Sequence, residues 1–205
     1  MKIVCISDTH CQHSDIVLPE GDMLIHAGDL TLRGTVEQLN DFFKWFGSLP
    51  FKYKIVVAGN HDFGMEDKIP GIAIPKGVIY LENSSVEVAG LKIWGSPIST
   101  PFGNWAFMWD LPRRTALYQT IPDDTDIVIN HGPAYGILDL TARDGTNVGC
   151  SALAERVKEI KPKLCVVGHI HEAYGTKIIG ETTYVNASIL NRQYRIANAP
   201  IVIEI

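Results

Sequence analysis

Histidine, aspartate and asparagine recur at five short turns of this sequence, and each turn follows an apolar run. The central turn is Gly59-Asn60-His61-Asp62, which places an amide, an imidazole and a carboxylate on one tight loop. The other four turns are Asp8-x-His10, Gly28-Asp29, His131-Gly132 and Gly168-His169-x-His171. A lone histidine is more often structural than a ligand. Five strand ends that each deliver a ligand-type side chain indicate one shared site.

These residue types suit a pair of neighbouring metal ions. Imidazoles favour Zn, Fe or Mn over Mg or Ca. Asp8 and Asp29 are the best carboxylates to lie between two cations, and the neutral amide of Asn60 adds no charge. His169 and His171 point the same way on an extended segment, so each could bind one metal. Two metals can ionise a water and clamp the reacting oxygens, as the very slow hydrolysis of phosphate esters requires.

Continuous apolar runs predict the strands that position these turns, because such runs are typical of strands covered on both faces. We expect these strands at 3–6, 22–26, 54–58, 126–130 and 164–167, and further strands at 78–81, 85–88, 91–94, 176–179, 182–186 and 200–205. Helical spacing of apolar residues predicts a helix over 35–46, with Thr35 as N-cap, and we expect further helices over 113–120 and 151–160. The alternation predicts an α/β fold with parallel or mixed sheets, whose ligands lie at the carboxyl ends of strands. A length of 205 residues predicts one domain, 1–205.

As an ordered set, the five motifs resemble the calcineurin-like metallophosphoesterase superfamily. Its pattern is Asp-x-His, Gly-Asp, Gly-Asn-His-Asp/Glu, His and then Gly-His-x-His, and the resemblance covers residues 8–171. It implies a four-layer α-β-β-α sandwich of two mixed β-sheets flanked by helices, and attack on phosphorus by a metal-bridging hydroxide. It assigns Asp8, His10, Asp29 and His171 to one metal, and Asp29, Asn60, His131 and His169 to the other.

The same resemblance makes His61 the non-ligand histidine beside the leaving group, as a proton donor or a contact to the phosphate. Many members carry an acidic residue three positions after the Gly-Asp aspartate, which can orient this histidine. Here that position is Leu32. We therefore expect another group to orient His61, with Asp62 as the candidate, and we expect Asn60 and His61 next to the substrate.

Further stretches resemble the metallophosphoesterase-domain-containing branch, which is similar to cyclic-nucleotide phosphodiesterases. They are Trp94-Gly95-Ser96-Pro97, Asn104-Trp105-Ala106-Phe107, His131-Gly132-Pro133, Gly168-His169-Ile170-His171-Glu172 and Val185-Asn186-Ala187-Ser188. This branch implies a phosphodiesterase that acts on cyclic or other small nucleotides with two divalent ions, usually Mn, with Fe or Zn as alternatives. The alternative functions are a phosphomonoesterase, including a protein phosphatase, or a catalytically silent scaffold on the same fold.

Residues in two loops have more than one interpretation. Arg143 and Asn147, in the glycine-containing loop after His131, could contact a phosphate or be solvated. In the aromatic loop 97–112, Trp105 and Phe107 could stack on a nucleobase, although a lid packed on the core is the favoured interpretation.

Three residues near the turns also have two interpretations each. His26 is interpreted either as holding a ligand in place or as a packed core histidine. For His13, a surface position is favoured over contact with the substrate. For Arg33, a surface salt bridge is favoured over steering of an anionic substrate.

Composition limits the classes of partner. The net charge of −5 argues against stable nucleic-acid binding, whereas a small phosphate ester remains compatible because bound cations can dominate the local field. The start of the chain lacks the form of a signal peptide, and no apolar run is long enough to span a bilayer. Four cysteines without CxxC spacing predict reduced thiols in a cytoplasmic protein. The sequence does not define an oligomeric state.

Overall fold

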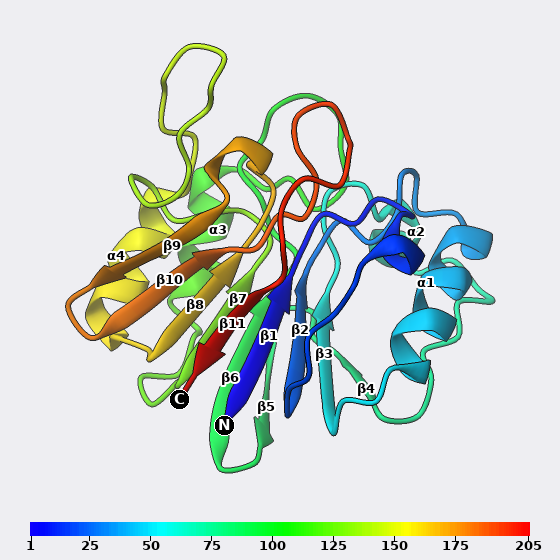
Figure 1. The fold of residues 1–205 in the computed structure, drawn as a ribbon. Coiled ribbons are helices and arrows are strands. Elements are labelled where there is room, and N and C mark those ends of the chain that lie inside the picture. Colours follow the sequence, from blue (N-terminus) through cyan, green and yellow to red (C-terminus); the bar gives the residue numbers. More distant parts are fainter.

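Two β-sheets packed face to face, with helices on both outer sides, make up the computed structural model, which describes residues 1–205 (Figure 1). The first sheet contains β1 (Lys2–Ile6), β2 (Met23–Ala27), β3 (Tyr53–Val57), β4 (Val78–Tyr80) and β11 (Ile201–Glu204). The second contains β5 (Ser84–Val88), β6 (Leu91–Ser96), β7 (Ile127–Asn130), β8 (Leu164–Val167), β9 (Gly175–Ile179) and β10 (Thr182–Asn186). The helices are α1 (Val36–Ser48), α2 (Phe63–Glu66), α3 (Leu111–Tyr118) and α4 (Ser151–Ile160), with 3-10 turns η1 (His13–Asp15) and η2 (His171–Ala173).

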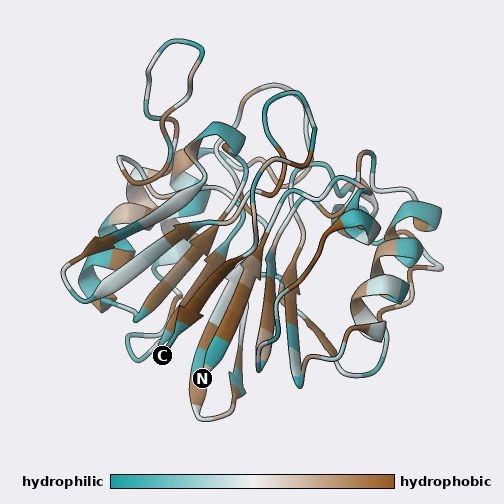
Figure 2. Ribbon diagram, viewed as in Figure 1, coloured by the Kyte–Doolittle hydropathy of each residue, from teal (hydrophilic) through white to brown (hydrophobic).

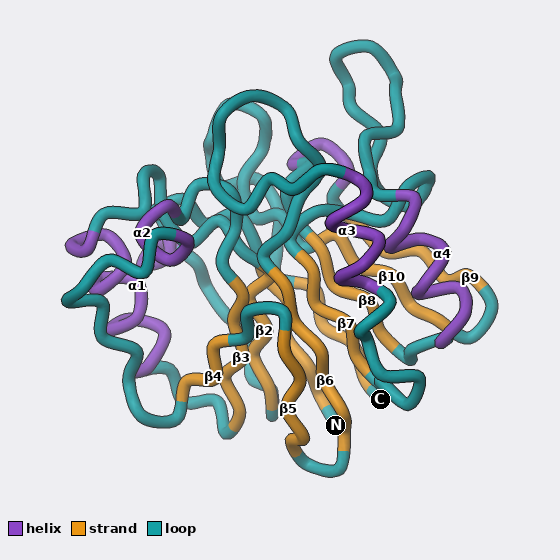
Figure 3. Tube along the Cα trace, turned by 180° about the vertical axis from the view of Figure 1, so that it is seen from behind, coloured by secondary structure: helices purple, strands orange, loops and turns teal.

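Both sheets are mixed, with a parallel centre. The first has the order β11-β1-β2-β3-β4, in which β1 to β4 are parallel and β11 is antiparallel to β1. The second has the order β5-β6-β7-β8-β10-β9, and only the edge strands β5 and β9 run antiparallel to their neighbours. Parallel strands end at the same edge of a sheet, so the loops that follow them gather at one end of the molecule (Figure 3).

The strand β1 illustrates why the run Ile3–Ile6 is apolar at every position. Ile3 and Cys5 pack in the core between the two sheets, whereas Val4 and Ile6 pack under α1 on the outer side. Side chains alternate across a strand, so a strand buried on both faces needs apolar residues at every position. The hydropathy colouring of the central strands follows this rule (Figure 2).

The helices complete the four layers. Thr35 caps α1 by accepting a hydrogen bond from Gln38 N, and the aromatic face of this helix packs on the first sheet. On the other side, Leu153 and Val157 of α4 pack on the second sheet. The structure therefore confirms the expected α/β sandwich of two mixed sheets flanked by helices.

Two local differences from the sequence expectations have clear causes. The helix α3 begins at Leu111 because the Asp110 side chain accepts from Arg113 N, and Pro112 is compatible with a first helical turn. The short helix α2 follows the Gly59–Asp62 turn directly, without a periodic apolar signal. None of the helices has the length and hydropathy required to cross a membrane.

Candidate metal centre

The two sheets meet at the carboxyl ends of β1 and β10. Ser7 forms an isolated parallel bridge with Ser188, and Ile189 N donates to Ser7 O at 2.9 Å. Gly168 lies so close that a Cβ there would be 1.9 Å from Ser7 Oγ. This contact brings the turns of the first sheet against those of the second.

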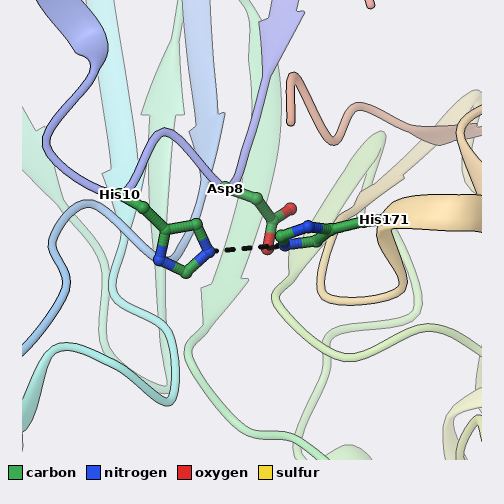
Figure 4. A group of neighbouring side chains, drawn as sticks. All are labelled: Asp8, His10 and His171. Atoms are coloured by element: carbon green, nitrogen blue, oxygen red, sulfur yellow. Dashed lines mark hydrogen bonds and ion pairs between the residues drawn. The ribbon is translucent and has the colours of Figure 1, made fainter. Parts of the chain in front are cut away.

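One cluster at this junction contains Asp8, His10 and His171 (Figure 4). His10 Nε2 lies 3.3 Å from His171 Nε2, which in turn lies 3.5 Å from Asp8 Oδ1. The other ring nitrogens, Nδ1, lie 3.1 Å from Thr31 O and 3.0 Å from Asn191 O. A carbonyl only accepts, so both Nδ1 atoms donate and both Nε2 atoms face the cluster.

A second cluster contains Asp29, His131 and His169. His131 Nε2 lies 3.4 Å from Asp29 Oδ1 and 3.0 Å from Asn60 Oδ1. His131 Nδ1 donates to Ala27 O at 2.9 Å, so its Nε2 atom also faces the cluster. The ring of His169 lies 5.0 Å from that of His131, centroid to centroid.

Asp29 lies between the two clusters. Its Oδ2 atom is 3.7 Å from His10 Nε2, and its Oδ1 atom is the one that faces His131. The donors around it are carboxylate oxygens, an amide oxygen and imidazole nitrogens, without a thiolate. Such a donor set, with its imidazoles oriented by backbone carbonyls, fits two divalent cations of the Mn, Fe or Zn type.

The electrostatics of the metal-free centre support this fit. Burial acts to raise the pKa of Asp8, but a hydrogen bond to His171 and the charge of His171 hold this pKa well below its usual range. Burial acts to lower the pKa values of His131 and His171. Asp29 nevertheless raises the pKa of His131 to about 9, and Asp8 raises that of His171 to about 9. Burial lowers the pKa of His10 to about 4. In the metal-free protein, the protonated His131 and His171 therefore balance the charge of Asp29 and Asp8, which bound cations would otherwise balance.

The imidazole of His61 faces this centre from the Gly59–Asp62 turn. His61 Nε2 lies 4.0 Å from Asp29 Oδ2, and His61 Nδ1 donates to Leu32 O at 3.0 Å. The ring also stacks on Trp105, with centroids 4.3 Å apart. Leu32 is the position at which the sequence lacks an acidic residue, and its backbone carbonyl orients the imidazole instead.

Asp62 does not orient His61, which corrects the expectation from the sequence. Its buried carboxylate accepts from the backbone N–H groups of Gly59, Leu30 and Thr31 and from the Thr31 hydroxyl. These bonds occupy both oxygens. Asp62 therefore holds the Gly59–Asp62 turn against the turn that carries Asp29.

The turns of the centre adopt unusual backbone conformations. Four candidate ligands have positive φ: Asp8 (54°), His10 (41°), Asp29 (55°) and His169 (69°). Left-handed conformations are costly for non-glycine residues and cluster at functional sites. Gly59 is required for space, because a Cβ there would lie 2.3 Å from Asp29 N.

The structure decides between the alternative interpretations of His26, His13 and Arg33. His26 is a buried core histidine that also supports the site: its Nε2 lies 3.1 Å from Thr9 Oγ1, and its Nδ1 accepts from Gly28 N. His13 is buried against α1 and lies 3.3 Å from Asp41, so the expected surface position is wrong. Arg33 has no ion-pair partner, so the favoured surface salt bridge is wrong; its guanidinium lies 5.8 Å from the Trp105 ring.

The two loops with open interpretations differ. Phe107 is buried in the core under α1, as expected for a packed lid, whereas Trp105 stacks on His61. Arg143 and Asn147 line a cavity of about 560 Å³ that also touches His169. Phe102 lines the same cavity; it is 53% exposed, and its ring centroid is 5.2 Å from that of His169.

Sequence reasoning missed several contacts to this centre. Ser7 and Ser188 donate to Asp8 Oδ2 at 2.6 and 2.8 Å, which leaves Asp8 Oδ1 facing the first cluster. Ser188 lies in the stretch 185–188, which had a sequence signal but no assigned role. Leu32 O and Tyr194, which packs on His10, carried none.

Comparisons with known proteins agree with this geometry. A family model described as calcineurin-like phosphoesterase matches residues 1–173. The chain is 40% identical to human metallophosphoesterase domain-containing protein 1, over 100% of this chain and 71% of that protein. It is 35% identical to UPF0046 protein K07C11.7 of Caenorhabditis elegans, over 98% of this chain and 74% of that protein.

A solved structure agrees on the fold. Phosphopantetheinyl hydrolase from Mycobacterium tuberculosis has a TM-score of 0.63 at 15% identity, over 94% of this chain and 90% of that one. The relatives confirm the resemblance to the metallophosphoesterase-domain-containing branch. The chain thus belongs to the calcineurin-like phosphoesterase family.

Proposed function

We propose that this protein hydrolyses phosphodiesters of small nucleotides at a centre of two divalent metal ions, with manganese as the metal. The observation that carries the proposal is the position of Asp29, whose two carboxylate oxygens face different clusters of imidazoles. A carboxylate shared in this way reduces the repulsion between two cations. We assign Asp8, His10, Asp29 and His171 to one ion, and Asp29, Asn60, His131 and His169 to the other.

When bound, the two ions supply an ionised water and neutralise charge on the phosphoryl oxygens. The protein provides the orientation. Carbonyls of Thr31, Asn191 and Ala27 hold the ring tautomers of three ligands. Asp62 holds the Asp29 turn through backbone N–H groups.

His61 is the proposed proton donor to the leaving oxygen. Because Nδ1 donates to Leu32 O, the remaining nitrogen, Nε2, faces the centre. The stack on Trp105 restricts the ring to this orientation. A proton held at Nε2 can therefore be delivered to a leaving oxygen at the centre.

The cavity beside His169 supports a nucleotide as the substrate. Its volume of about 560 Å³ lies within the usual range for small-molecule sites. Phe102 presents an exposed ring next to His169, on which a planar base can stack. Arg143 and Asn147, which also line this cavity, offer donors to the ester's polar groups.

The metal proposal is tested by turnover of bis-p-nitrophenyl phosphate after the purified protein is stripped and reloaded with Mn, Fe or Zn. Asp29→Asn should lower both metal content and turnover. Asp126→Asn is the matched control, because Asp126 directly precedes β7 and forms an ion pair with Lys163. This variant should leave metal content and turnover unchanged. Full metal content and turnover in Asp29→Asn, or an inactive wild type with every ion, would contradict the proposal.

The substrate proposal is tested by comparing cyclic nucleotides, nucleoside monophosphates and a diester without a ring, glycerophosphocholine. Phe102→Ala should raise KM for the cyclic nucleotide roughly 5- to 100-fold, the range expected for one base–aromatic stack, and leave glycerophosphocholine unchanged. Faster turnover of monoesters than of diesters by the wild type would favour a phosphomonoesterase instead.

A further inference from the structure

Tyr194 approaches the proposed metal centre from a part of the chain that the family model does not match. The model ends at residue 173, and Tyr194 lies in the loop between β10 and β11. This loop, orange-red in Figure 1, arches over the end of the molecule where the other loops gather. A residue outside the region that the family model matches therefore lies at the proposed centre.

The ring of Tyr194 packs against three histidines. Its centroid lies 4.8 Å from that of His10, 5.3 Å from that of His171 and 6.2 Å from that of His61. Two of these are proposed ligands of one ion, and His61 is the proposed proton donor. Tyr194 consequently borders the space in which a phosphate bound to that ion would lie.

The backbone keeps Tyr194 in this position. Its φ of 56° is left-handed, which is unusual for a bulky residue. Tyr194 N donates to Asn191 O, and Gln12 Nε2 donates to Tyr194 O at 3.0 Å. Asn191 O also accepts from His171 Nδ1, so one turn places both the tyrosine and a proposed ligand.

The space beside Tyr194 is open to solvent and reaches both clusters. A cavity of about 190 Å³ is lined by Tyr194, His169, His171, Glu172 and Arg192. Tyr194 is 43% exposed, and its hydroxyl makes no hydrogen bond within the protein. A phenol carries its proton at neutral pH, so Tyr194, whose ring borders the centre, offers a free donor.

We propose that Tyr194 is a catalytic residue of this enzyme, whose hydroxyl donates a hydrogen bond to a phosphoryl oxygen of the substrate. This inference rests on the proposed phosphoesterase function. If the ring only packed against the histidines, phenylalanine would serve equally well, and the hydroxyl would have no partner to bind.

The test compares Tyr194→Phe and Tyr194→Leu with the wild type, loaded with manganese, by bis-p-nitrophenyl phosphate kinetics and elemental analysis. Tyr194→Phe should lower kcat/KM by about 10- to 100-fold, as expected for one hydrogen bond to a charged group, with full metal content. It should also weaken inhibition by inorganic phosphate. Tyr174→Phe is the matched control, because it removes a hydroxyl that binds Ala199 O in the same C-terminal segment.

Wild-type kcat/KM in Tyr194→Phe would overturn the inference, and a loss only in Tyr194→Leu would assign the ring a packing role instead. Loss of metal from Tyr194→Phe in parallel with activity would also overturn it, since the residue would then act through the ligands. An inactive wild type with every divalent ion would refute the proposed function itself, and this inference with it.

Discussion

Metal loading of this centre is expected to release about two protons from its histidines at pH 7.5. In the metal-free protein, the pKa values of His131 and His171 are raised to about 9, against burial, by Asp29 and Asp8 respectively. Both imidazoles are then more than about nine-tenths protonated at pH 7.5. His10 and His169, whose pKa values burial lowers to about 4 and about 3, are already neutral.

The sign of the pH dependence follows from these values. Ligation requires a neutral imidazole, so each ion displaces one proton. Between pH 7 and 8 both protons are still held in the metal-free state. Release of these two histidine protons alone should tighten binding of the two ions together about 10-fold per proton, or roughly 100-fold, over that unit. The increase should level off above about pH 9, where the metal-free histidines lose their protons.

Calorimetric titration of the stripped protein with manganese in two buffers of different ionisation enthalpy measures this release. The difference in the observed heats at pH 7.5 should correspond to at least about two protons, which come from the two histidines, and to about one more where the bound water ionises. His13→Gln is a control, because His13 pairs with Asp41 outside the centre and should not alter the count. Equal heats in both buffers would refute the reasoning, since His131 and His171 would then be neutral before metal binds.

Three further variants test how the turns position these groups. Gly59→Ala should lower the stability by about 1–3 kcal/mol and reduce metal content, because its Cβ would lie 2.4 Å from Asp29 Oδ1; unchanged thermal unfolding and metal content would contradict this. His61→Ala should lower kcat roughly 10²–10⁴-fold with metal still bound, and wild-type turnover would remove His61 from the mechanism. Trp105→Leu should lower kcat by about 2- to 10-fold through loss of the stack, but not further in a His61→Ala background; an additional loss in the double variant would assign Trp105 a role independent of His61.

The ligand-type residues and most of the strands could be predicted from the sequence. A strand buried on both faces needs an apolar residue at every position, so runs such as Ile3–Ile6 mark β1 without any tertiary information. The turn residues that follow, such as Asp8 and His10, are side chains whose chemistry is evident from their type. Their spacing and order were sufficient to indicate the family, which the comparisons confirm.

Contacts between distant loops could be decided only by the tertiary structure. The group that orients His61 is the backbone carbonyl of Leu32, and every residue has such a carbonyl, so sequence carries no signal for it. Asp62 has the right side chain for that task, but three backbone N–H groups from two turns occupy it.

The same reason applies to the residues that enclose the centre. His13 is polar and lies beyond the first turn, yet packing of η1 against α1 buries it. Tyr194 reaches His10 because the loop after β10 crosses from the second sheet to the first. Local sequence thus determined which groups are available and where strands end, because periodicity and side-chain chemistry are local properties. The packing of two sheets against each other determined which of these groups touch.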